Sequence, residues 1–75
     1  MERKYRILGI APYENLKNAM VTEAAKYEDI EMVVYTGNLE DGAQLALQHM
    51  NEGFDILISR GGTAELIRPV ATIPV

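Results

Sequence analysis

The fold is decided by residues 54–68, FDILISRGGTAELIR, where an apolar run passes through two glycines into a helical pattern. Phe54–Ser59 is predicted to be a strand, because its centre is wholly apolar. Arg60–Thr63 is predicted to be a loop, and Ala64–Arg68 the start of a short helix. A strand followed so closely by a helix is typical of parallel α/β folds.

The rest of the chain repeats this alternation of strands and helices. Strands are predicted at 5–11 and 29–35, helices at 13–27 and 39–52, and Ile73–Val75 is expected to begin a fourth strand. The order βαβαβαβ predicts a three-layer α/β fold, a Rossmann-like or flavodoxin-like parallel sheet with right-handed crossovers. Three short helices cover such a sheet poorly, and the last strand stops after three residues. We therefore expect residues 1–75 to be the N-terminal part of a larger domain, or to complete their sheet with a partner chain.

Composition excludes several classes of protein. The chain has 75 residues, a net charge of -4 and no cysteine, which excludes a disulfide framework and thiolate metal sites. The acidic balance argues against nucleic-acid contact by this segment, because phosphates need a clustered basic surface. No run is long enough for a signal-peptide core or a membrane span, so a cytoplasmic location without a membrane partner is expected.

Ligands of open α/β sheets bind beyond the carboxyl ends of the strands, and three segments lie there. They are Ala11-Pro12-Tyr13, Thr36-Gly37-Asn38 and Ser59-Arg60-Gly61-Gly62-Thr63. The last segment combines free helix amides, hydroxyls and a guanidinium, which together suit an anion. Two interpretations stay open: an anion cradle, or a tight turn in which Thr63 caps the helix and Arg60 faces solvent. Likewise, Tyr13 either stacks on a ligand or only packs. Residues 36–38 either donate hydrogen bonds to a ligand or form only a turn with Asn38 as a helix cap.

Several known sites are missing their residues. No G-x-G-x-x-G follows the first strand, and no P-loop lysine pattern is present. A phosphoacceptor receiver domain would need acidic residues where Ala11-Pro12 and Ser59-Arg60 stand. His49 is the only histidine and has no metal-ligand partners at suitable spacing, so a surface position is expected. No catalytic residue, metal or cofactor is predicted.

One family resemblance covers the whole chain. The segments RILGIAPY (6–13), GFDILI (53–58), ISRGGTAELIR (58–68) and IPV (73–75) resemble the N-terminal sensory domain of the propionate catabolism regulators. These regulators are a branch of the sigma-54-dependent transcriptional activators. The resemblance covers all 75 residues but only about the first half of that domain.

The resemblance implies a ligand-sensing domain and not an enzyme. Two Rossmann-like subdomains would enclose a small anionic metabolite, such as methylcitrate, ahead of an ATPase and a DNA-binding domain that are absent from this chain. The parent protein would act on sigma-54 RNA polymerase and promoter DNA, and a homo-oligomer is expected. By matching position, the residues lining the cleft would be Ala11, Pro12, Tyr13, Ser59, Arg60, Gly61, Gly62 and Thr63.

Two alternatives remain from the sequence. One is a sugar-binding effector domain of the periplasmic-binding type, although one Phe and no Trp offer few aromatic platforms. The other is a ligand-free dimerisation module that pairs through an open sheet edge.

Overall fold

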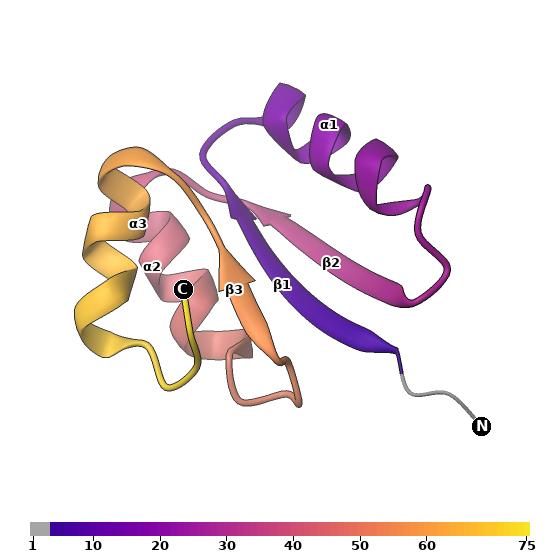
Figure 1. The fold of residues 1–75 in the computed structure, drawn as a ribbon. Coiled ribbons are helices and arrows are strands. Elements are labelled where there is room, and N and C mark those ends of the chain that lie inside the picture. The colour runs from indigo at the N-terminus through magenta and orange to yellow at the C-terminus, as the bar shows by residue number, and fades with distance from the viewer. Residues whose placement is uncertain (1–3) are drawn as a thin grey trace.

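The computed structural model describes residues 4–75 and alternates strands with helices (Figure 1). The elements in chain order are β1 (Tyr5–Ala11), α1 (Glu14–Ala24), β2 (Ile30–Thr36), α2 (Leu39–His49), β3 (Ile56–Ile58), α3 (Gly61–Ile67) and the 3-10 turn η1 (Arg68–Val70). The predicted order of strands and helices is therefore confirmed through the third helix.

The strands form one parallel sheet in the order β2-β1-β3. β1 lies in the centre because its apolar residues are buried on both faces, from Ile7 to Ala11. It pairs with β2 over its full length, from Tyr5 opposite Ile30 to Ala11 opposite Thr36. Pairing with β3 covers only Ile7–Gly9.

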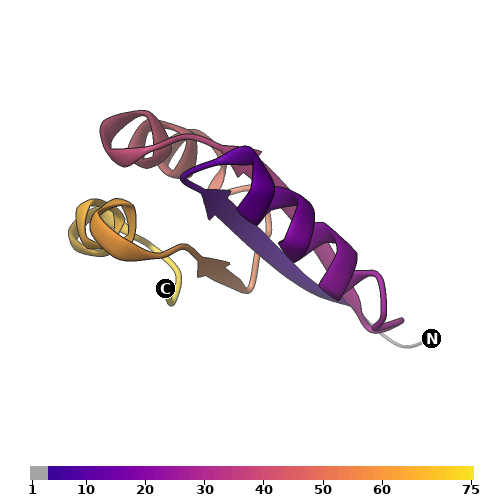
Figure 2. The same cartoon turned by 90° about the horizontal axis from the view of Figure 1, so that it is seen from above.

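The helices lie on both faces of the sheet, as the topology requires. The chain moves to one side of β1 to make β2 and to the other side to make β3. Right-handed crossovers therefore put α1 and α2 on opposite faces. Figure 1 shows α1 on one side of the strands and α2 with α3 on the other, and Figure 2 shows α1 running along β1. This is the predicted three-layer, flavodoxin-like α/β fold.

The two faces of the sheet are covered unequally. The core lies on the α2 and α3 side and comprises Leu8, Ile10, Ala46, Met50, Phe54, Leu57 and Ile67. Each fully buried Leu or Ile there contributes about 1.5–3 kcal/mol. On the other face α1 has no fully buried residue, and Ile56 and Ile58 of β3 stay 37% and 39% exposed. Stability therefore depends mainly on one side of the sheet.

The ends of the elements differ from the predictions by a few residues. α1 ends at Ala24 because the following amides form tighter i,i+3 bonds, such as Tyr27 N to Ala24 O at 3.1 Å. Helix α3 begins at Gly61, three residues earlier than predicted, because Gly61 adopts a φ of 60° that turns the chain directly into the helix.

Residues 71–75 form no strand, although the segment lies beside β3. Its carbonyl at Pro74 accepts a hydrogen bond from Leu57 N at 2.8 Å. Pro74 has no N–H to return to β3, so the ladder of a fourth strand is not formed within the described residues.

Candidate functional site

The carboxyl ends of β1 and β3 meet where the chain reverses its direction across the sheet. From β1 the chain runs toward β2, whereas β3 lies on the opposite side of β1. Such a switch point is where open α/β sheets hold ligands. Two of the three predicted segments, 11–13 and 59–63, lie here, at or directly after the ends of β1 and β3.

Two contacts join these loops. Ser59 Oγ donates to Ile10 O at 2.8 Å, which ties the end of β3 to the end of β1. Arg60 Nη1 lies 3.5 Å from Tyr13 Oη, so the guanidinium reaches across to the first loop. The structure therefore brings the predicted segments together, although they are 47 residues apart.

Four of the predicted site residues are exposed and present groups that can bind an anion. Tyr13 is 50% exposed, and Arg60, Gly61 and Gly62 are also exposed. Gly61 and Gly62 are the first residues of α3, whose amides have no acceptor one turn earlier in the helix. No atom lies within 4 Å of where a Cβ of Gly61 would stand. The guanidinium and these amides are thus accessible on one surface.

The other predicted site residues hold the scaffold. Ala11 is fully buried and its carbonyl accepts from Gly37 N at 2.8 Å. Pro12 is half-buried, and Ser59 uses its hydroxyl on Ile10. Thr63 is only 1% exposed and lies inside α3, so the interpretation of Thr63 as the helix cap is wrong. Their role in ligand binding stays a prediction.

The loop after β2, the third predicted segment, lies at the same edge, and a hydrogen bond that the sequence did not indicate joins it to α3. Thr63 Oγ1 accepts from Leu39 N at 2.8 Å and lies 3.4 Å from Asn38 Oδ1. Asn38 occupies the N-cap position of α2, but its side chain makes no capping bond. Leu39 has a φ of 48°, which is uncommon for a residue with a side chain. Leucine gives no sequence signal for such a backbone.

A carboxylate also lies at this edge. Glu14, in the first turn of α1, accepts a hydrogen bond from Thr36 Oγ1 at 2.8 Å and lies 3.8 Å from Lys17 Nζ. Glu14 was not among the residues predicted from the sequence. Its two partners hold the carboxylate over β2, the neighbour of β1 on the side opposite β3.

Comparison with family models matches residues 26–75 to the propionate catabolism activator family. The chain belongs to this family. The matched segment contains Ser59–Thr63 but begins after Tyr13. No curated protein and no solved structure matches the chain.

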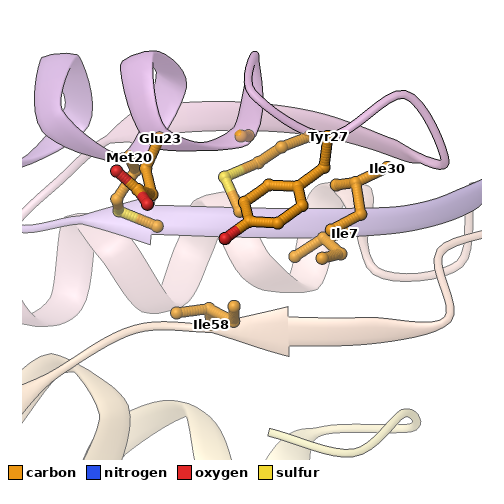
Figure 3. A pocket seen from close by; sticks show the side chains of 8 residues that line it. Ile7, Met20, Glu23, Tyr27, Ile30 and Ile58 are labelled. Carbon is orange, nitrogen blue, oxygen red and sulfur yellow. The ribbon is translucent and has the colours of Figure 1, made fainter.

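The domain also has an apolar groove on the face of the sheet that α1 covers, which is the less covered face. The groove has a volume of about 260 Å³. Figure 3 shows Met20 and Tyr27 extending over β1 toward Ile58 of β3. The lining residues are Ile7, Met20, Glu23, Ala24, Tyr27, Ile30, Met32 and Ile58. Glu23, which pairs with Lys26 at 3.0 Å, is the single charged member, so the groove offers apolar contact and no anion site.

No group of three or more His, Cys, Asp or Glu side chains among residues 4–75 could hold a metal ion. No helix there is long and apolar enough to cross a membrane.

Proposed function

We propose that this regulatory domain senses a small carboxylated metabolite and thereby controls an ATPase elsewhere in a sigma-54-dependent activator. Family membership supports the regulatory role. The choice of an anion depends on one observation: Arg60, Gly61 and Gly62 are exposed together at the switch point.

The chemistry of these groups favours a carboxylate over a neutral ligand. A guanidinium binds a carboxylate through two parallel hydrogen bonds, and backbone amides add further donors. Tyr13 beside Arg60 supplies a hydroxyl and an aromatic face for the remainder of the ligand. A ligand held this way touches both the loop after β1 and the loop after β3.

The mechanism is a shift between two arrangements of the protein. A ligand changes such an equilibrium only by its difference in affinity for the two arrangements. In the parent protein, a second subdomain would close over the switch point and complete the ligand cleft. Closure would then relieve or impose repression of the ATPase.

The role is binding and not catalysis, in the cytoplasm, where sigma-54 polymerase acts. Contact with the polymerase and with promoter DNA would come from other parts of the parent protein, because this segment carries a net charge of -4.

Calorimetry of the full-length protein tests the proposal. Methylcitrate and related tricarboxylates are expected to bind. Replacing Arg60 by Ala should weaken binding by about 1.5–3 kcal/mol, the usual contribution of a charged hydrogen bond. Arg68→Ala is the matched control, since Arg68 is an exposed arginine paired with Glu65 at 2.6 Å.

Two results would overturn this assignment. One is the absence of heat with every carboxylate tested while the fold stays intact. The other is a neutral sugar that binds in preference to the acids, which would favour a sugar-binding effector domain.

A further inference from the structure

The two edges of the sheet differ in how they are protected. On β3, the outward amide of Leu57 is bonded to Pro74 O. β2, by contrast, has β1 as its only neighbour among the described strands. An unpaired strand edge is a template for another chain.

Two hydrogen bonds between β1 and the ends of β2 show which backbone groups of β2 point away from the sheet. Tyr5 N donates to Asp29 O, and Gly37 N donates to Ala11 O, both at 2.8 Å. Along a strand, the N–H and C=O groups of successive residues point alternately to one side and the other. Residues 29, 31, 33, 35 and 37 therefore bond to β1. The N–H and C=O groups of the remaining β2 residues therefore face away from the sheet, at Ile30, Met32, Val34 and Thr36.

This edge lacks the usual protection against pairing. Ile30–Thr36 contains no proline, lysine or glycine, and its continuous register with β1 leaves no bulge. The one charged side chain, Glu31, is bonded by Arg6 Nε at 3.1 Å, which draws it toward β1. Seven residues of extended backbone are thus available.

We infer that β2 is the interface of a homodimer, in which two copies pair antiparallel through this edge about a twofold axis at Val33. In that register Met32 of one copy bonds Val34 of the other, and Ile30 bonds Thr36. Glu31 then lies opposite Tyr35 and Val33 opposite Val33, so no like charges face each other. An axis at Glu31 would place two carboxylates together.

Helix α1 fits the same axis. Glu14 reaches Thr36 at 2.8 Å, and Val21, two turns later, lies on the same side of the helix. From residue 14 to 21 the helix rises about 10 Å. From Thr36 back to Val33 the strand covers a similar length of about 10 Å. Val21, which is 45% exposed, is therefore level with the axis.

The spacing of the two α1 helices also suits packing. α1 packs over β1 and β2, and adjacent strands lie about 4.8 Å apart. Across a β2–β2 pair the two α1 axes would be separated by about 10 Å, at the upper end of ordinary helix packing distances. One twofold axis thus pairs the outward backbone groups of both β2 strands and also brings together Val21 from each copy. The proposal does not depend on the identity of the ligand.

Sedimentation equilibrium and hydrogen exchange of the 75-residue chain test this dimer. With rising protein concentration, the mass should increase from 8.4 kDa toward twice that value. The Met32 and Val34 amides should become protected in parallel, whereas the Val33 and Tyr35 amides, bonded to β1, are protected at all concentrations. A constant mass of 8.4 kDa up to millimolar protein would overturn the proposal, and so would association without added protection at Met32 and Val34.

A pair of variants separates this interface from non-specific association. Val21→Lys places two cations at the axis and should raise the dimer dissociation constant about tenfold or more. Val70→Lys is the matched control, because Val70 is similarly exposed (43%) and lies in η1, beyond α3. Equal effects of the two substitutions would contradict the β2 interface.

Discussion

The side chain of Thr63 connects α3 to the loop between β2 and α2, at the end of the sheet where the strands terminate. Its hydroxyl accepts from Leu39 N at 2.8 Å, and that bond holds Leu39 at a φ of 48°. A leucine in this conformation costs about 1–2 kcal/mol relative to ordinary helical backbone. The buried threonine therefore maintains a strained turn at the start of α2, next to the proposed ligand site.

Replacing Thr63 by Val should destabilise the domain. Valine keeps the shape but removes the acceptor, so the Leu39 amide loses its partner, at a cost of about 1–3 kcal/mol. Urea unfolding followed by circular dichroism measures this loss. Thr63→Ser retains the hydroxyl and should cost less than Thr63→Val; the reverse order would show that the methyl group, and not the hydrogen bond, is what matters.

At the scale of elements, Gly42 shows packing overriding helix propensity. Gly42 lies within α2, where glycine is normally about 1 kcal/mol worse than alanine. A Cβ there would stand 2.5 Å from Gly37 O and 2.5 Å from Thr63 Cγ2. α2 thus approaches both the β2–α2 loop and α3 too closely for any side chain.

We therefore expect Gly42→Ala to destabilise the fold in spite of the better propensity of alanine. Overpacking of this kind costs about 1–3 kcal/mol, which exceeds the propensity gain. Thermal unfolding provides the measurement. Gln48→Ala, at an exposed position of the same helix, serves as the control and should change stability little. A Gly42→Ala protein as stable as the wild type would mean that α2 can move away from α3.

How far the sequence predicts these elements depends on the range of the interactions involved. Strand β1 was predicted with its observed ends, because Tyr5–Ala11 is an almost unbroken apolar run that ends at Pro12. β3 was predicted as 54–59 but spans only Ile56–Ile58, since pairing with β1 sets its length. The local sequence of a strand does not indicate how many of its residues will pair with a distant strand.

The candidate site was predictable to the same extent. Glycines, a guanidinium and hydroxyls after a buried strand identify the loop at 59–63, and sheet topology brings Tyr13 beside it. The burial of Thr63 and its bond to Leu39 could not be predicted, because they arise from contact between helices α2 and α3. His49 illustrates the same limit: expected on the surface, it is half-buried and stacks on Tyr35 with centroids 4.1 Å apart.

For the whole molecule, the charge of the chain modulates the proposed dimer. Each copy carries a net charge of -4, so two copies repel one another. Raising the salt concentration from about 0.01 M to 0.15 M shortens the Debye length from about 30 Å to 8 Å and should strengthen dimerisation. Sedimentation at the two salt concentrations provides the measurement. Weaker association at the higher salt concentration would indicate an interface formed by opposite charges and not by β2.

The sheet also separates the two proposed functions, ligand binding and dimerisation, in space. The polar switch point lies at the carboxyl edge, whereas the β2 edge and the apolar groove lie along the strands. Ligand binding and association can therefore be measured independently on one chain. Substitutions at Arg60 should leave association unchanged, and Val21→Lys should leave ligand binding unchanged.

The most direct test of the ligand site is an NMR titration that follows the backbone amides of the 75-residue chain. Methylcitrate added to millimolar concentration should shift the amide signals of Gly61 and Gly62 most strongly, because their N–H groups would donate to its carboxylates. Arg60→Ala should abolish most of this shift. Signals at 61 and 62 that stay unchanged, or shifts that gather instead around Met20, Tyr27 and Ile58, would contradict an anion receptor at the switch point.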